Sequence, residues 1–261
     1  MINWNNFLVF AIPTILSWVL ASVIFTFSKK NKLGLFFSIF GLFIFGSFIV
    51  LLWVNLGRPP MRTMGETRLL YSFFLVATGL LSYLKWRYKW LVSYSLVMAM
   101  VFVFINILKP EIHSKNLMPA LQSIWFVPHV TAYILSYSIL GAATIVGVKQ
   151  LFQFNKKEDA ELMDFTDNLV YIGFGLLMLG MLMGAVWAKA AWGHYWSWDP
   201  KETWAFITAA AYLFYIHLRL SNKYRKIALW YLVFAFIMLM ITWKGVNYLP
   251  SAKNSIHVYT D

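Results

Sequence analysis

Eight strongly apolar runs alternate with short polar connections along the chain. A helix that crosses a bilayer needs about 20 mostly apolar residues, since each residue advances the helix by about 1.5 Å. The pattern therefore predicts an all-α polytopic membrane protein that forms one transmembrane domain over residues 1–261. The eight predicted spans are Phe7–Phe27, Leu33–Val54, Leu69–Leu84, Trp90–Leu108, Ile124–Val148, Leu169–Val186, Trp204–Leu218 and Ile227–Met240.

The composition indicates the same class of protein. The 261 residues are 61% hydrophobic and only 12% charged, and the mean hydropathy is +0.66. A soluble domain of this length could not bury so much apolar surface, whereas a bilayer accepts it directly. The first run lacks a basic leader and a small-residue cleavage site, so we expect a retained helix rather than a signal peptide.

The positions of lysine and arginine predict the orientation in the membrane. Thirteen of the 22 Lys and Arg residues fall in or beside the connections after the first, third, fifth and seventh runs. Cytoplasmic connections carry the excess of basic residues in membrane proteins. We therefore expect both termini and the connection at residues 187–203 to face outward. The net charge of +12 is mostly this topology signal and does not indicate nucleic-acid binding.

Several kinds of chemistry are excluded by what the chain lacks. It contains no cysteine, which excludes disulfides, cysteine-ligated clusters and a thiol nucleophile. It also lacks either common glycine-rich loop that binds phosphate. One soluble-looking segment, residues 155–168, carries seven charged side chains. We expect it to be a short cytoplasmic amphipathic turn without chemistry.

The connection between the sixth and seventh runs, which we call the Trp-rich loop (residues 187–203), has an unusual composition. Four tryptophans fall within residues 192–204, together with charges and a proline. Its second half predicts a helix start, with Asp199 at the N-cap, Pro200 at the first helical position and Glu202 reaching back to the cap. Anchoring at a membrane interface also enriches tryptophan, but it does not require this order of residues. We expect a tryptophan-lined surface outside the bilayer that suits a large, flat aromatic ligand.

Two of the histidines expected on the outer side flank the Trp-rich loop in sequence. His129 is near the outer end of the fifth run, and His257 is in the outer tail, residues 241–261. Neutral imidazole is the usual protein ligand of haem iron, and the iron accepts one axial ligand on each face. The pair therefore predicts a bis-histidine haem site open to the outside. His113, in an outer loop, is expected to contact solvent or lipid headgroups.

His217 lies within the seventh run, and an ionisable residue in a membrane segment is a functional candidate. Eighteen residues separate it from Asp199, which is roughly 27 Å of helix and five whole turns. We therefore expect it to face the same interior as the Trp-rich loop, from near the cytoplasmic edge. The alternative is that it hydrogen-bonds to a neighbouring helix or extends toward the interface beside Arg219.

Several motifs together carry a resemblance to a known family. The string Trp192-Gly193-x-x-Trp196-x-Trp198-Asp199-Pro200-Lys201-Glu202 resembles the signature of the haem-handling WWD proteins of cytochrome c assembly. Pro119-Ala120-Leu121-Gln122-Ser123-x-Trp125-x-x-x-His129-Val130 resembles the stretch around that family's first external histidine. Gly245-Val246-Asn247, followed by His257, resembles the region of the second. Pro60 to Glu66 is weakly similar to an outer-loop motif of one branch, from which Arg62 and Gly65 depart.

Eight spans, with a histidine in the penultimate one, resemble the CcsA (ResC) branch of the system II machinery rather than the six-span CcmC or the much longer CcmF. The resemblance implies that His129 and His257 are the axial ligands of haem b at the outer site, and that His217 is a transient ligand. It assigns no role to His113, His194 or Glu66. The loop residues that it implies in haem binding are Trp192, Gly193, Trp196, Trp198, Asp199, Pro200 and Glu202.

The resemblance also implies partners and a location. A separate CcsB (ResB) membrane protein would supply a second intramembrane histidine, and the client would be an apocytochrome c with a Cys-x-x-Cys-His segment. The membrane would be the bacterial cytoplasmic membrane, with the Trp-rich loop facing the periplasm. The implied activity is export of haem and its presentation for thioether attachment, as part of a cytochrome c synthase complex. The chain itself would contribute positioning and iron ligation, because the thiols belong to the client.

Two other functional classes also fit parts of the pattern. A b-type electron-transfer subunit uses bis-histidine haem as well, but it normally places both ligands within its spans, whereas His129 and His257 are at or beyond the outer edge. A transporter without haem would use the Trp-rich loop as a lid. Such a fold should show paired helix interruptions in the two halves of the chain, and the sequence has no such pairing.

Overall fold

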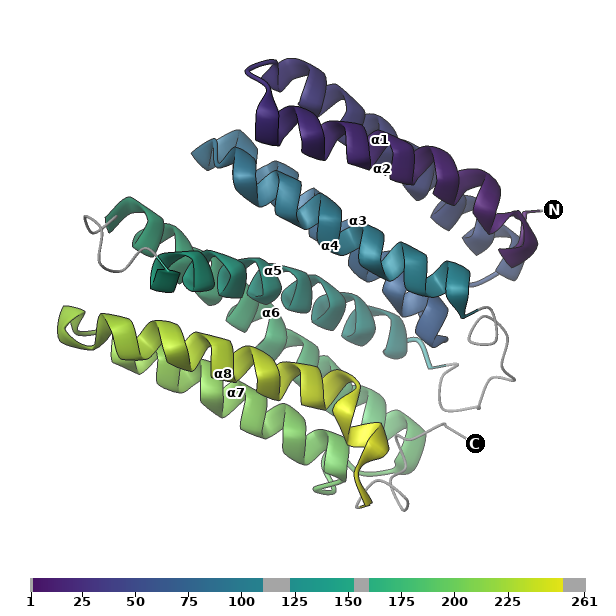
Figure 1. Ribbon diagram of the computed structural model, residues 1–261. Coiled ribbons are helices and arrows are strands. Elements are labelled where there is room, and N and C mark those ends of the chain that lie inside the picture. The colour runs from purple at the N-terminus through teal and green to yellow at the C-terminus, as the bar shows by residue number, and fades with distance from the viewer. Residues whose placement is uncertain (1, 110–122, 153–159, 251–261) are drawn as a thin grey trace. The chain divides into compact units, whose positions relative to one another are not determined.

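The computed structural model describes residues 2–109, 123–152 and 160–250. All regular elements among them are helical, which confirms the predicted all-α class (Figure 1). The α-helices are α1 (Phe7–Phe27), α2 (Asn31–Leu56), α3 (Met64–Trp86), α4 (Lys89–Leu108), α5 (Phe126–Phe152), α6 (Ala160–Trp192), α7 (Pro200–Arg219) and α8 (Arg225–Trp243); the short 3₁₀ helices are η1 (Trp4–Asn6), η4 (Asn222–Tyr224) and η5 (Gly245–Tyr248).

The helices match the predicted spans at their apolar centres and differ at their ends. α1 has the predicted bounds, whereas α6 has 33 residues and extends beyond Leu169–Val186 in both directions. The prediction of a short turn is wrong for residues 160–168, which form the first turns of α6. Their polarity is compatible with a helix because Asp167 is buried against partners from α7. The remainder of that segment, residues 153–159, lies outside the described residues.

Seven of the eight helices are long and apolar enough to cross a membrane by length and composition. The protein is therefore a polytopic membrane protein, as the apolar runs predict. α7 is the helix that falls outside this set, although its 20 residues give it a length of about 30 Å. Its first turn carries Lys201 and Glu202, and its last carries His217 and Arg219, so its polar ends lower the average hydropathy. A helix of this kind suits a functional rather than a purely structural place in the membrane.

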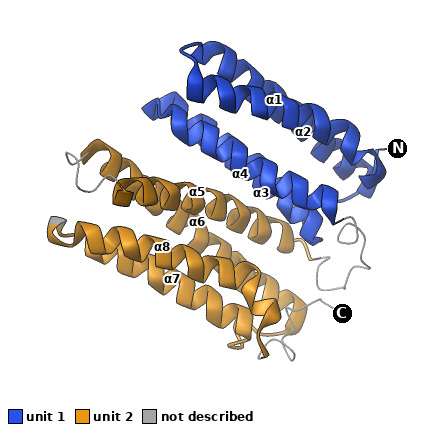
Figure 2. Cartoon of the chain, viewed as in Figure 1, with its two compact units in different colours: residues 1–122 blue, residues 123–261 orange. Residues whose placement is uncertain are grey.

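The chain forms two compact units, residues 1–122 and 123–261, and each is described by itself (Figure 2). In unit 1, α1 packs against α2 and α4, and α3 packs against the same two helices. Trp18 of α1 is fully buried and lies 5.4 Å from Phe45 of α2 between ring centroids. The indole fits there because position 41 is glycine: a Cβ on Gly41 would come within 2.6 Å of it.

A buried carboxylate organises the start of α3. Glu66 is 1% exposed and accepts two hydrogen bonds from the guanidinium of Arg58, at 2.8 and 3.0 Å. It also accepts from the backbone N–H of Thr63, whose hydroxyl caps the helix in return. Desolvation and the nearby Arg58 lower the pKa of Arg62, and Glu66 partly opposes this effect. Glu66, to which the family resemblance assigns no role, is thus a capping and ion-pairing residue.

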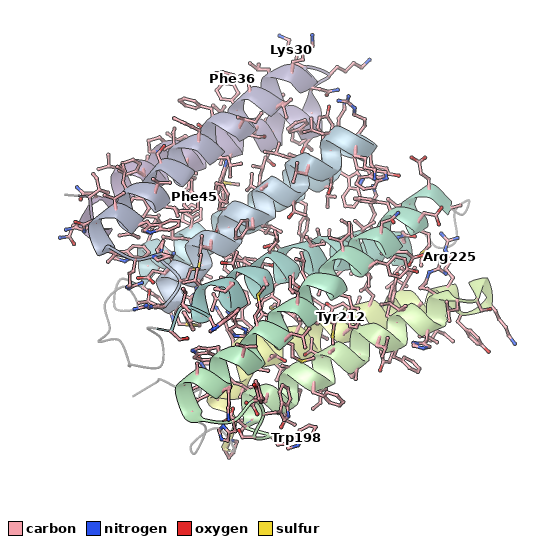
Figure 3. All side chains as sticks on the ribbon, turned by 180° about the vertical axis from the view of Figure 1, so that it is seen from behind. Lys30, Phe36, Phe45, Trp198, Tyr212 and Arg225 are labelled. Carbon is pink, nitrogen blue, oxygen red and sulfur yellow. The ribbon has the colours of Figure 1, made fainter. Side chains whose placement is uncertain are left out.

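Unit 2 is a ring of four helices in which α5 neighbours α6 and α8, and α7 neighbours α6 and α8. The Trp-rich loop joins α6 to α7 at one end of this ring. The starts of α6 and α8 and the ends of α5 and α7 lie at the opposite end, so Trp198 and Arg225 mark the two ends in Figure 3. η5, which follows α8, packs against both α7 and α8. The start of the tail therefore lies beside the helix that begins at the Trp-rich loop.

Candidate functional site

The Trp-rich loop is shorter than the predicted residues 187–203, because α6 continues to Trp192 and α7 begins at Pro200. α6 ends at Trp192, and Gly193 follows in a left-handed conformation with φ +88°, which glycine adopts without steric cost. At the other side Asp199 is the N-cap of α7 and Pro200 is its first residue. The Asp199 carboxylate accepts a hydrogen bond from the N–H of Lys201 at 2.9 Å. The predicted helix start is confirmed.

Glu202 holds the second half of the loop together. One of its carboxylate oxygens accepts hydrogen bonds from the N–H of Ser197 at 2.7 Å, the hydroxyl of Ser197 at 3.2 Å and the N–H of Asp199 at 3.2 Å. Both acidic side chains of the motif are buried. Their negative charge lies at the N-terminus of α7, where the helix dipole favours it. Asp199 and Glu202 thus fix the backbone conformation of the segment that carries the tryptophans.

Trp198 has a strained backbone and an exposed ring. Its φ of +60° is in the left-handed region, which costs an L-residue with a Cβ roughly 1–2 kcal/mol. Its carbonyl accepts a hydrogen bond from the hydroxyl of Thr203 at 3.1 Å. The ring is 62% exposed and packs edge-to-face on Trp196 and Phe206, at 5.7 and 5.8 Å between centroids. A strained residue that presents a large aromatic ring is typical of a binding surface.

Trp192 belongs to a second aromatic group, centred on Trp187 of α6. Trp187 is buried and packs edge-to-face on Trp192 at 4.7 Å and on Phe126 of α5 at 5.3 Å between ring centroids. The imidazole of His129 lies nearly parallel to the same indole, at 5.5 Å and an interplanar angle of 23°. The structure therefore brings the predicted ligand His129 and the predicted loop residue Trp192 into contact with one buried tryptophan.

The imidazole of His129 packs against two glycines of α6, Gly180 and Gly184, which we call the glycine seat. Its Nδ1 lies 2.8 Å from the carbonyl oxygen of Gly180. A carbonyl only accepts, so Nδ1 carries the proton, and in the neutral ring the lone pair is on Nε2. A Cβ on Gly184 would lie 2.6 Å from Cε1 and 2.7 Å from Nδ1 of the ring. Only glycine at position 184 leaves room for the imidazole in this orientation.

An aromatic row runs along α5 from His129 toward the end of α8. Tyr133 packs edge-to-face on His129 at 4.7 Å, and Tyr137 follows at 5.5 Å from Tyr133 between centroids. Tyr137 then packs on Trp243, the last residue of α8, at 5.7 Å. The row shows that the end of α8, from which the tail continues, packs against α5. His257 itself, the second predicted axial ligand, lies outside the described residues.

His217 is exposed on α7, two residues before the helix ends. Its Nδ1 lies 2.8 Å from the carbonyl oxygen of Leu213 in the preceding turn, so it too holds its lone pair on Nε2 when neutral. The expectation that it faces the interior is wrong. The buried side chains of α7 include Thr208, Tyr212 and Tyr215, and His217 lies on the face opposite these three.

The remaining sequence candidates are two histidines and the stretch before α5. His194 is exposed in the loop, while His113 and the stretch Pro119 to Gln122 lie outside the described residues. Sequence reasoning missed Trp187, Gly180 and Gly184. The spacing of the two glycines, four residues apart on one helix, is the signal that favours close approach of another helix. It does not reveal that the side chain received there is His129.

Comparison with known proteins is consistent with these motifs. Residues 4–252 match the family of cytochrome C assembly proteins. The chain is 32% identical to the "Cytochrome c biogenesis protein CcsA" of Mesostigma viride, with 90% of each chain covered. It is 32% identical to the protein of the same name from Cuscuta exaltata over 74% of this chain and 72% of that one. The corresponding figures for Nymphaea alba are 30%, 89% and 86%. The family match includes His129, His217 and the Trp-rich loop and ends five residues before His257.

Proposed function

Because the chain belongs to the cytochrome c assembly family, as its relatives named CcsA also show, we propose that it binds haem b outside the membrane for attachment to an apocytochrome c. Its role in cytochrome c biogenesis follows from the family. Haem binding at the Trp-rich loop and His129, with His257 as the second axial ligand, is our proposal for how it performs that role. Haem is here a substrate that the protein holds and passes on.

One observation supports the outer site above all others: Trp187 contacts both His129 and Trp192. An iron ligand and a flat aromatic surface are the two features that a porphyrin site needs. The chain supplies both from α5 and the end of α6, within one packed group. The bond from Nδ1 to the Gly180 carbonyl fixes the tautomer that coordinates through Nε2, and such a bond also orients a ligating imidazole.

His257 is within reach of this site by chain length. It lies nine residues after Tyr248, the last residue of η5, and nine extended residues span up to roughly 30 Å. Near the start of the tail, Thr242 of α8 donates a hydrogen bond to the carbonyl of Trp204 at 2.9 Å. This bond fastens the end of α8 to the first turns of α7, close to the Trp-rich loop. The tail thus begins on the side of unit 2 where the second ligand is needed.

The membrane orientation follows from the basic residues. Arg219, Lys223, Arg225 and Lys226 gather at the end of unit 2 opposite the Trp-rich loop. Basic residues concentrate on the cytoplasmic side, so we place this end in the cytoplasm and the loop outside. The membrane proposed is the bacterial cytoplasmic membrane, with both chain termini and the loop in the periplasm. His217 then lies near the cytoplasmic surface, where it would receive haem.

The chemistry divides between this chain and its partners. The thiols that form the thioether bonds come from the Cys-x-x-Cys-His segment of the apocytochrome, because this chain contains no cysteine. Each thiol adds its S–H across one haem vinyl group. The client's own histidine then replaces one outer ligand and the product leaves. At the inner side, His217 is exposed on α7, where a CcsB (ResB) membrane protein can supply the second imidazole.

The experiment is a cytochrome c maturation assay in cells that carry His129→Ala or His257→Ala. Each change leaves the iron with one axial ligand from this chain, so covalent haem attachment should be lost. Imidazole in the medium should partly restore attachment by occupying the vacant position. His194→Ala is the matched control, because His194 is an exposed histidine of the same loop. Normal maturation in both His129→Ala and His257→Ala, at normal protein levels, would refute the bis-histidine site.

A further inference from the structure

A second polar cluster lies at the end of unit 2 opposite the Trp-rich loop. The guanidinium of Arg219 on α7 donates from Nε to both carboxylate oxygens of Asp167 on α6, at 3.0 Å each, and its Nη2 lies 2.9 Å from Oδ2. The hydroxyl of Tyr215 donates to Oδ1 of the same carboxylate at 2.7 Å. Two side chains that are four residues apart on α7 therefore donate hydrogen bonds to one carboxylate of α6.

This cluster is buried and charge-balanced. The side chains of Arg219 and Asp167 are 6% and 11% exposed, and Tyr215 is fully buried. A single charge buried among membrane helices is unfavourable, whereas a pair with a bidentate geometry is tolerated. Each of the three groups thus requires the other two in place, and this fixes the rotation of α7 about its axis relative to α6.

The cluster continues into the other two helices of the unit. Gln150 of α5 donates to the hydroxyl of Thr166 at 2.7 Å, and Thr166 is the residue before Asp167. The same glutamine accepts a hydrogen bond from Arg225 of α8 at 3.5 Å. Side chains from α5, α6, α7 and α8 therefore meet at this end. Arg225 marks the position of the cluster in Figure 3.

The geometry of α7 links this cluster to His217. Successive residues of a helix are about 100° apart, so Tyr215 and Arg219 lie on nearly the same face, and His217, midway between them, lies on the opposite face. Holding the first pair against α6 directs the histidine outward, where the structure places it. We propose that Asp167, Tyr215 and Arg219 are positioning residues that hold His217 on the exposed face of α7, ready to contact haem. This inference rests on the proposed role of His217 as the inner haem ligand.

The position of residue 217 can be measured without haem. The chain contains no cysteine, so His217→Cys introduces a unique thiol for a nitroxide spin label. The electron paramagnetic resonance spectrum should show one mobile label in the otherwise unchanged protein. Asp167→Asn should add an immobilised component, and Tyr215→Phe, which keeps the ion pair and is the milder change, should add a smaller one.

Thr208→Val is the matched control. Thr208 forms a buried hydrogen bond from α7 to Thr242 of α8 at 2.8 Å, but it lies nine residues before position 217, roughly 13 Å along the helix. Its loss should leave the label spectrum unchanged. An unchanged spectrum in folded Asp167→Asn and Tyr215→Phe would overturn the positioning role.

The haem readout uses His217 intact in a His129→Ala, His257→Ala background, which removes both proposed outer ligands and leaves His217 as the proposed haem ligand of this chain. Asp167→Asn should lose haem absorbance in this background, and Asp167→Glu, which restores the carboxylate, should regain part of it. Loss of haem in Asp167→Asn without any change of the label spectrum contradicts positioning. If His217→Ala leaves haem unchanged while the label responds to Asp167→Asn, the positioning role stands and the proposed haem contact of His217 fails.

Discussion

Gly184→Ala places a methyl group where the imidazole of His129 lies. In the structure this Cβ would be 2.6 Å from Cε1 and 2.7 Å from Nδ1 of the ring. Ordinary carbon contacts are about 3.5–4.0 Å, so the ring must move by roughly 1 Å. Nδ1 lies 2.8 Å from the Gly180 carbonyl, and a shift of that size lengthens the distance beyond hydrogen-bond range. The substitution therefore moves Nε2, the atom proposed to bind iron, and removes the bond that orients the ring.

The substitution is expected to stabilise α6 locally and to destabilise the packing around His129. Alanine in place of glycine within a helix is favourable by roughly 0.5–1 kcal/mol. Overpacking against a fixed ring costs about 1–3 kcal/mol, and the lost hydrogen bond costs about 0.5–1.5 kcal/mol more. Gly184→Ala should therefore be destabilising overall, by roughly 0.5–4 kcal/mol, and should weaken the proposed axial bond from His129.

Gly175→Ala is the matched control, because Gly175 is also within α6 and a Cβ there meets nothing within 4 Å. Purified Gly184→Ala should lose the low-spin, six-coordinate haem spectrum, and added imidazole should restore it. Gly175→Ala should keep the spectrum and melt at a slightly higher temperature. A wild-type spectrum in Gly184→Ala would refute the glycine seat, as would equal loss in the two variants.

Substitutions at three positions separate structural from binding roles in the loop and the end of α6. Asp199→Asn should keep helix capping within a few tenths of a kcal/mol, whereas Asp199→Ala should cost about 1 kcal/mol. Thermal unfolding followed by circular dichroism measures both. Haem loss in Asp199→Asn would show a role of the charge itself. Trp198→Gly should relieve roughly 1–2 kcal/mol of left-handed strain and still lower haem content, and a rise in haem content would exclude the ring from the site. Trp187→Ala should destabilise the protein by about 3–5 kcal/mol and lower haem content below that of Trp187→Phe, measured as the haem-to-protein ratio.

The features that sequence predicted are those set by neighbours along the chain. Apolar runs specify the helices because a bilayer leaves few other structures for such segments. The Asp199 and Glu202 cap is equally local, since every group in it lies within three residues of another. By contrast, the Gly180 seat for His129 and the pair of Asp167 with Arg219 join residues 51 and 52 positions apart. Spacing along one helix does not identify such partners.

The error about His217 has a specific physical cause. The expectation used Asp199 to define the inner face of α7, but the Asp199 side chain turns back to cap the helix and does not mark a face. Packing of Tyr212 and Tyr215, both fully buried, sets the inner face instead. The position of an N-cap residue therefore does not show which face of the helix is buried.

The central claim is that His129 ligates haem beside the Trp-rich loop. The most direct measurement is the absorption spectrum of the purified protein, compared with purified His129→Ala. We predict that the wild-type protein retains haem with a low-spin, bis-histidine spectrum, and that His129→Ala loses this spectrum and regains it with added imidazole. Identical haem content and spectrum in the two proteins would contradict the account.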